Sequence, residues 1–152
     1  MLRVVLDSNA VDPLIDMLGA AESVRSAIDR GELKVLYTHV TIDELATTPD
    51  LDRRQRLILV LAEIGTLVPA GAFVLGYSRL GHGRLMADED VPTFQALTSG
   101  SVDHSRDALI AFTARVEGCA LVTNEKRLAA RAREQGIEVL TSQQLLRAIG
   151  FE

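Results

Sequence analysis

Five short apolar runs alternate with helix-like segments along nearly the whole chain. Each run is a few residues long and ends in turn residues, which is typical of strands buried in a parallel sheet. The segments between them carry apolar residues at helical spacing. The sequence therefore predicts an α/β fold, a three-layer sandwich in which helices cover both faces of a central parallel five-stranded sheet. The predicted strands are residues 4–6, 33–37, 66–68, 120–122 and 137–140.

Proline, glycine and capping patterns mark the ends of the helices. Thr41–Glu44 and Thr141–Gln144 both have capping-box spacing, which predicts that a helix begins at each. Residues 69–100 are interrupted by glycines and predict a helix only at 92–97. The other predicted helices are residues 12–18, 20–30, 41–48, 51–64, 103–117, one from 123 or 124 to 135, and a last one from 141.

The composition predicts one ordinary globular domain, residues 1–152. A net charge of −5 argues against a protein that coats nucleic acid by neutralising phosphates, but it is compatible with an acidic cation site. No apolar run has the length of a membrane span, and the N-terminus lacks the pattern of a secretory signal. The single cysteine, Cys119, cannot form an internal disulfide, so we expect a cytoplasmic protein not bound to a membrane.

Four acidic residues flank predicted strands at positions that a parallel sheet brings together. Asp7 ends the first strand, and Glu44 lies in the first helical turn after the second. Asp107 lies early in the helix before the fourth strand, and Glu125 follows that strand. If strands one and four are neighbours, all four acids lie at the carboxyl edge of the sheet, where such folds bind ligands.

Carboxylates gathered at one edge raise one another's pKa, and a divalent cation relieves their repulsion. Mg²⁺ and Mn²⁺ prefer oxygen ligands and make bound water acidic enough to attack a phosphodiester. We therefore predict a Mg²⁺ or Mn²⁺ site with nuclease chemistry at Asp7, Glu44, Asp107 and Glu125. Asp103, one helical turn before Asp107, is a further candidate ligand.

Each acid also has a purely structural alternative. Asp7 would cap a turn, and Glu44 would be the partner of Thr41 in its capping box. Asp107 and Glu125 would complement the positive end of a helix, a role worth about 0.3–1 kcal/mol. One shared site accounts for all four positions together, whereas these alternatives require separate coincidences.

Other catalytic chemistries find little support in the sequence. The three histidines have no metal-ligand spacing to one another, and no nucleotide-binding glycine motif or nucleophile elbow is present. An aspartyl-phosphate phosphatase or a receiver domain needs a paired acid after the first strand and a lysine at a later strand end. Ser8 and Asn9 follow Asp7 instead, and the only lysines are Lys34 and Lys126.

Four motifs follow one another in an order that resembles one protein family. They are Leu6–Asn9, Thr41–Leu45, Asp107–Ala111 and Leu121–Leu128, and they span nearly the whole chain except about residues 71–102. No single motif is specific, but the combination resembles the PIN-domain ribonucleases, and within them the VapC toxins of type II toxin–antitoxin pairs.

The resemblance implies a PIN-like fold and a Mg²⁺- or Mn²⁺-dependent endoribonuclease that cleaves RNA, forms homodimers and is inhibited by a small antitoxin protein. Asp7, Glu44 and Asp107 match the core acids, and Glu125 matches a fourth position where the family usually has Asp. Because Glu is one methylene longer, we expect Glu125 to act through a bound water or on a second metal. The alternative is a degenerate PIN domain that binds RNA or protein without catalysis.

Further polar and basic residues complete the predicted site. The resemblance implies that Ser8 or Thr123 supplies a hydroxyl and that Asn9 braces the first loop. Lys126 and Arg127, next to Glu125, are candidates for contact with RNA phosphates. The predicted supporting residues are Ser8, Asn9, Thr123 and Asn124.

Overall fold

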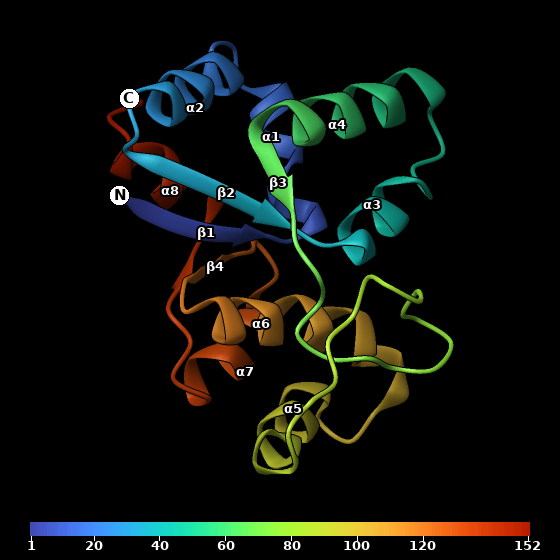
Figure 1. Ribbon diagram of the computed structural model, residues 1–152. Coiled ribbons are helices and arrows are strands. Elements are labelled where there is room, and N and C mark those ends of the chain that lie inside the picture. The colour runs from blue at the N-terminus through green and yellow to red at the C-terminus, as the bar shows by residue number, and fades with distance from the viewer.

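The computed structural model describes all 152 residues. It contains five strands: β1 (Leu2–Leu6), β2 (Leu33–Tyr37), β3 (Gly65–Leu67), β4 (Ala120–Val122) and β5 (Val139–Leu140). All pairings are parallel, and the order is β3-β2-β1-β4-β5, so β1 lies at the centre (Figure 1). The predicted α/β class and parallel five-stranded sheet are confirmed.

The helices are α1 (Asp12–Asp16), α2 (Ala20–Asp29), α3 (His39–Leu45), α4 (Leu51–Ile64), α5 (Val91–Thr98), α6 (Ser105–Glu117), α7 (Lys126–Glu134) and α8 (Ser142–Ala148). Short 3-10 turns form at residues 8–10, 88–90 and 102–104. None of the helices combines the length and the apolar character that a membrane crossing needs.

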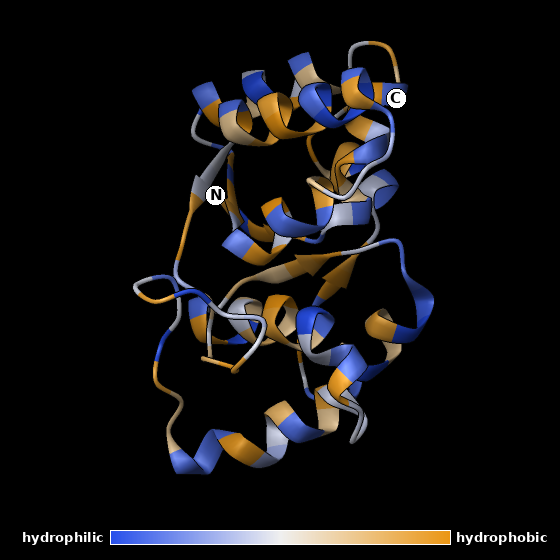
Figure 2. Cartoon of the chain, turned by 90° about the vertical axis from the view of Figure 1, so that its right-hand side faces the viewer, coloured by the Kyte–Doolittle hydropathy of each residue, from blue (hydrophilic) through white to orange (hydrophobic).

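Both faces of the sheet are covered because successive residues of a strand point to opposite sides. Val4 and Leu6 of β1 pack with α1, α2, α4 and α8, whereas Val5 packs with α5, α6 and α7. Each face holds a cluster of 19 buried apolar residues. Figure 2 shows the apolar strands enclosed between the two layers of helices.

Helix α3 begins earlier than predicted. It starts at His39 after the N-cap Thr38, so Thr41 lies inside the helix, and the predicted capping box at Thr41–Glu44 is wrong. The physical reason is a better partner for the hydroxyl. Thr41 is fully buried and donates its hydroxyl to the carbonyl oxygen of Leu6 at 3.1 Å, which fixes α3 against the end of β1.

The other helix ends differ by a few residues. Helix α6 begins at Ser105 because residues 102–104 form a 3-10 turn, and α7 begins at Lys126 because Glu125 is its N-cap. Helix α1 ends at Asp16, where the backbone becomes extended. The capping box predicted at Thr141–Gln144 is confirmed at the start of α8.

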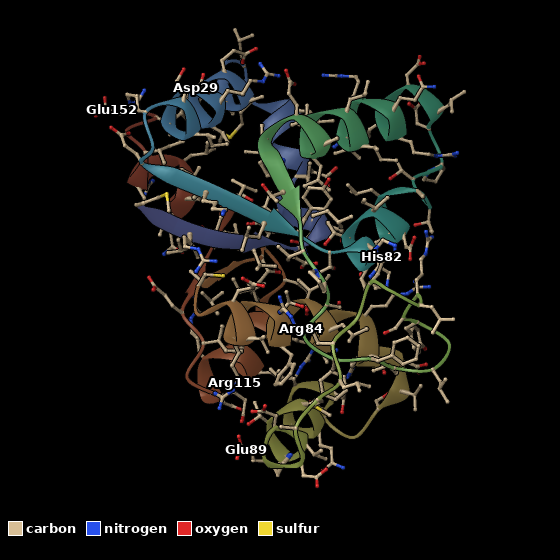
Figure 3. The ribbon with its side chains drawn as sticks, in the orientation of Figure 1. Asp29, His82, Arg84, Glu89, Arg115 and Glu152 are labelled. Carbon is tan, nitrogen blue, oxygen red and sulfur yellow. The ribbon has the colours of Figure 1, made fainter.

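The long connection between β3 and α5 runs across α6 towards α3 (Figure 1). The backbone N–H of Gly71 donates to Thr113 Oγ1 of α6 at 2.9 Å. A Cβ at Gly71 would lie 2.8 Å from the ring of Phe112, so this close crossing requires glycine. Further on, the ring of His82 lies 5.8 Å from that of His39, beside α3 (Figure 3). The connection is therefore anchored on both helices that flank the carboxyl edge of β1.

Candidate metal centre

Asp7 lies at the carboxyl end of the central strand with only 2% of its surface exposed. The register pairs Leu6 of β1 with Val122 of β4, so the next residues, Asp7 and Thr123, are neighbours. Thr123 Oγ1 donates to Asp7 Oδ2 at 2.7 Å, and the backbone N–H of Ser8 donates to Oδ1 at 2.8 Å. These two hydrogen bonds fix the orientation of the carboxylate.

Glu44 reaches the same edge from helix α3, which follows β2. Ser8 Oγ donates to Glu44 Oε2 at 2.6 Å, so Ser8 joins the loop after β1 to this helix. The other oxygen, Oε1, is buried and has no hydrogen-bond partner in the protein. Leaving a buried acceptor unpaired costs about 1–3 kcal/mol, which indicates that a further group completes the site.

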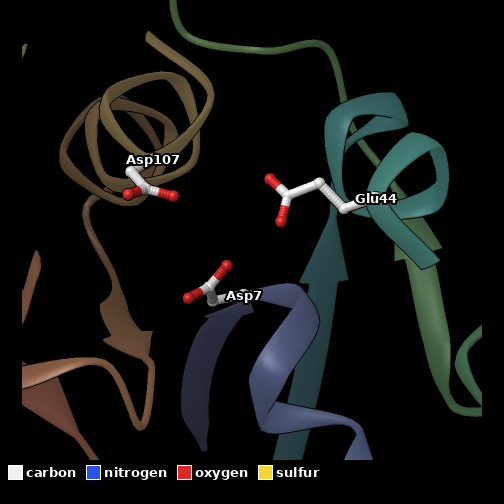
Figure 4. Close-up of side chains that lie close together, drawn as sticks. All are labelled: Asp7, Glu44 and Asp107. Atoms are coloured by element: carbon white, nitrogen blue, oxygen red, sulfur yellow. The ribbon is translucent and has the colours of Figure 1, made fainter. Parts of the chain in front are cut away.

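Asp107 approaches the edge from the first turn of α6, opposite α3 (Figure 4). Its only salt-bridge partner is Arg131 of α7, whose Nη2 lies 3.8 Å from Oδ2. Arg131 also donates from Nε to the carbonyl oxygen of Leu97 at 3.0 Å. Because Arg131 is shared with the end of α5 and lies at this longer distance, it compensates the charge of Asp107 only in part.

Asp7, Glu44 and Asp107 form one acidic cluster. Each offers an oxygen, and these three oxygens all lie within 4.8 Å of one another (Figure 4). Burial, reinforced by the neighbouring acids, raises the pKa of Glu44 to about 7 and that of Asp107 to about 6. Burial also raises the pKa of Asp7, despite the hydrogen bonds from Thr123 and Ser8. The cluster thus holds more negative charge than its surroundings neutralise.

The donor set fits a hard divalent cation. All three groups are carboxylates, the ligands that Mg²⁺ and Mn²⁺ prefer, and Oε1 of Glu44 has no other partner. Beside Glu44 and Asp107 lies a cavity of about 360 Å³, which leaves space for water and for part of a substrate. The cluster can therefore hold a divalent cation that remains accessible from the cavity.

Asn9 and Asn124 hold together the loops that follow β1 and β4. The backbone N–H of Asn124 donates to Asn9 Oδ1 at 2.9 Å, and Asn124 Nδ2 donates to the carbonyl oxygen of Asn9 at 3.1 Å. Asn124 Oδ1 also accepts the backbone N–H of Ser142 at 3.0 Å, at the start of α8. Both asparagines are therefore placed to brace the loops that carry Asp7 and Thr123.

Glu125 lies outside the three-carboxylate cluster. Its two oxygens accept the backbone N–H groups of Arg127 at 3.1 Å and Leu128 at 2.9 Å, so the side chain caps helix α7. Its charge still reaches the site, because it raises the pKa of both Asp7 and Asp107. The structure thus gives Glu125 a capping contact, and its role as a fourth metal ligand stays a prediction.

The basic residues of the cavity differ from the expected ones. Lys126 and Arg127 are exposed in the first turn of α7, and neither lines the cavity. Arg106 lines it instead, together with Asp103, which is exposed and lies outside the cluster. Sequence analysis missed both Arg106 and Arg131. Each lies among ordinary charged helix residues. No motif in the sequence signals that the packing of the helices brings Arg106 and Arg131 to the site.

A parallel sheet in this order, with an acidic cluster at its carboxyl edge, defines an α/β protein with a candidate metal centre. VapBC2 from Rickettsia felis, solved with a DNA fragment from its promoter, aligns with a TM-score of 0.57 at 12% identity, covering 92% of this chain and 98% of that one. A protein from Pyrobaculum aerophilum aligns with a TM-score of 0.59 at 22% identity, covering 97% and 96%. A PilT N-terminus domain protein from Sulfolobus solfataricus gives 0.53 at 14%, covering 99% and 96%.

No protein-family model and no curated protein matches this chain. At the identities of these structural neighbours, the likeness establishes the fold. The chain has the PIN fold of VapC and PilT N-terminus proteins, as the resemblance of its motifs implied.

Proposed function

We propose that this protein is a metal-dependent endoribonuclease of the VapC type that cleaves single-stranded RNA. The observation that carries the proposal is the cluster of Asp7, Glu44 and Asp107 at the carboxyl edge of a PIN-type sheet. These three carboxylates would hold Mg²⁺ or Mn²⁺. When bound, such a cation supplies acidified water and stabilises the negative charge that develops on a phosphodiester under attack.

The residues around the cluster prepare it for this role. Hydrogen bonds from Thr123 and Ser8 hold the carboxylates of Asp7 and Glu44 in place, so they need little rearrangement to act as ligands. Because the pKa of Glu44 is about 7, its carboxyl group is partly protonated at neutral pH, and a cation must displace that proton. We therefore expect cation affinity to rise with pH through the neutral range.

A small antitoxin protein and a second copy of the chain are the proposed partners. The neighbour VapBC2 was solved with promoter DNA, which supports a partner that also binds DNA. Leu18 and Leu59, 99% and 67% exposed, line a groove of about 310 Å³ between α1, α2 and α4 that offers apolar surface to such a partner. A stable complex with the product of a small adjacent gene would support this assignment.

The test is cleavage of end-labelled random-sequence single-stranded RNA, with Mn²⁺ or with EDTA. We expect cleavage by the wild type that stops on chelation, and a loss of about a hundredfold or more in Asp7→Asn and Asp107→Asn, because each removes a ligand charge. Asp103→Asn is the matched control, since it removes the same charge from the same cavity outside the cluster. Undiminished cleavage by the two cluster variants would refute the site.

A non-catalytic PIN domain that binds RNA or protein is the second candidate. It is favoured by one observation, the capping of α7 by Glu125, which leaves three acids rather than four at the edge. The same experiment separates the two functions. Binding of RNA without any Mn²⁺-dependent cleavage would establish the second.

A further inference from the structure

Arg106 is the one basic residue among those that line the cavity beside the acidic cluster. It lies at the start of α6, immediately before Asp107. Asp12, Glu44 and Asp103 line the same cavity. An anionic strand that enters this cavity therefore meets several carboxylates and a single guanidinium.

The exposed guanidinium of Arg106 makes a cation–π contact and no ion pair with an acid. Its Cζ lies 5.6 Å from the centre of the Tyr77 ring, and the side chain forms no ion pair or hydrogen bond within the protein. Arg131, by contrast, is bonded to Leu97 and faces Asp107. A cation–π contact uses none of the N–H donors of arginine in hydrogen bonds to an acid, and their fork matches the oxygens of a phosphate.

The segment that carries Tyr77 is itself anchored to the helix that carries Glu44. The ring nitrogen Nε2 of His39 lies 3.3 Å from the carbonyl oxygen of Tyr77, and Arg79 pairs with Asp43, also on α3. The Tyr77–Arg106 contact thus joins α6, which carries Asp107, to a segment fixed on α3, which carries Glu44. The field of Arg106 reaches the cluster, where it opposes the rise in the pKa of Glu44.

We propose that Arg106, in cation–π contact with Tyr77, binds a phosphate of the single-stranded RNA substrate beside the acidic cluster. This inference rests on the proposed endoribonuclease function and deepens it by naming a residue that binds the RNA beside the acidic cluster. Lys126 and Arg127, the candidates for phosphate contact from the sequence, do not line this cavity. Arg106 offsets the repulsion between the RNA backbone and the carboxylates.

The test is the salt dependence of RNA binding, measured by fluorescence anisotropy of labelled single-stranded RNA in EDTA, where the proposed cleavage cannot occur. For single strands, each phosphate contact contributes about 0.7 to the slope of log affinity against log salt concentration. We expect Arg106→Gln to weaken binding about tenfold at low salt and to lower the slope by about 0.7. Arg106→Lys keeps the charge, so we expect it to retain the slope while losing part of the affinity.

Arg115→Gln is the matched control. Arg115 is an exposed arginine towards the other end of the same helix (Figure 3), so it loses the same charge away from the cavity. An unchanged slope in Arg106→Gln, or equal decreases in Arg106→Gln and Arg115→Gln, would overturn the inference. So would a wild type that binds no RNA.

Failure of the proposed function would look different. If the slope falls only in Arg106→Gln, yet the wild type cleaves no RNA with Mn²⁺, the phosphate contact stands and the endoribonuclease function fails. If the wild type cleaves RNA and Arg106→Gln binds and cleaves like Arg115→Gln, the function stands and the inference about Arg106 fails.

Discussion

Acids with little exposure are paired with arginines at one edge of the sheet and mostly unpaired at the other. At the amino edge, Glu117 is 15% exposed at its side chain and is paired with two arginines, Arg3 at 3.2 Å and Arg84. At the carboxyl edge, the three clustered carboxylates form a single ion pair, between Asp107 and Arg131 at 3.8 Å. The fold can therefore neutralise a buried acid with its own side chains, and at the carboxyl edge it does not.

The difference separates a structural cluster from one suited to a ligand. Raised pKa values at Asp7, Glu44 and Asp107 mean that the folded chain holds these groups at a cost when they are ionised. A cation bound at this edge would remove that cost, as Arg3 and Arg84 do for Glu117. We therefore expect divalent cations to change the stability through the carboxyl edge, and the three clustered acids to lower the stability as the pH rises.

The largest expected effect is on the free energy of unfolding without metal. Between about pH 4 and pH 7 the folded state binds more protons than the unfolded state, because Glu44 and Asp107 have pKa values near 7 and 6. The contribution of these two groups to stability is therefore fully present below pH 4 and is lost as the pH rises through 7. We expect a loss of roughly 3 kcal/mol, at about 1.4 kcal/mol per pKa unit, discounted for partial exposure.

Urea unfolding across this pH range in EDTA measures that loss. Glu44→Gln removes one of the two groups whose pKa values rise to about 6 or 7, so we expect it to abolish a large part of this pH dependence. Glu117→Gln is the control, because its carboxyl group lies at the amino edge. If Glu44→Gln leaves the pH dependence of the free energy of unfolding unchanged, ionisation of the acids at the carboxyl edge does not destabilise the folded chain.

A smaller effect is expected at the amino edge itself. Glu117→Gln breaks the ion pairs with Arg3 and Arg84, whose side chains are 36% and 33% exposed. We expect a loss of about 1 kcal/mol, since solvent screens such pairs. The stabilisation by Mn²⁺ should be that of the wild type, as thermal unfolding with and without Mn²⁺ would show. If Glu117→Gln unfolds cooperatively but Mn²⁺ no longer raises its Tm, the two edges do not act independently.

An effect of similar size is expected at Glu125, which caps α7. Glu125→Ala removes the acceptor for two backbone N–H groups, and we expect a loss of about 1 kcal/mol in stability. Glu125→Gln keeps an acceptor, and we expect it to lower cleavage less than Asp7→Asn does. Metal titration of cleavage checks this. An equal loss of activity in Glu125→Gln and Asp7→Asn would instead make Glu125 a full metal ligand.

The arrangement of the sheet and of three acids could be predicted because it depends on local patterns and chain order. Asp7 ends an apolar run, and a parallel sheet brings the ends of its strands to one edge. Glu44 and Asp107 lie in helices adjoining strands β2 and β4, so a shift of a few residues in the helix start leaves them near that edge. Glu44 lies at the carboxyl edge as predicted, although the capping box predicted for it is wrong.

Details that depend on packing could not be predicted. Whether Glu125 faces the cluster or the helix depends on where α7 begins, and the sequence placed that start at 123 or 124 rather than at Lys126. Arg131 reaches the site because α7 packs beside α6, and Arg106 lines the cavity because α6 packs beside α3, and no local pattern encodes either contact. The path of the connection that carries Tyr77 is fixed by contacts with α3 and α6, far away in sequence.

The central claim is that the carboxyl edge is built for a divalent cation, and Mn²⁺ titration followed by thermal unfolding tests it most directly. A ligand that binds only the folded state at a hundredfold excess over Kd stabilises it by about 2.7 kcal/mol, which raises the Tm of a chain of this size by roughly 5–10 °C. We expect this rise in the wild type and in Asp103→Asn, and little or none in Asp7→Asn. Equal shifts in wild type and Asp7→Asn would contradict the account, because the cation would then bind somewhere else.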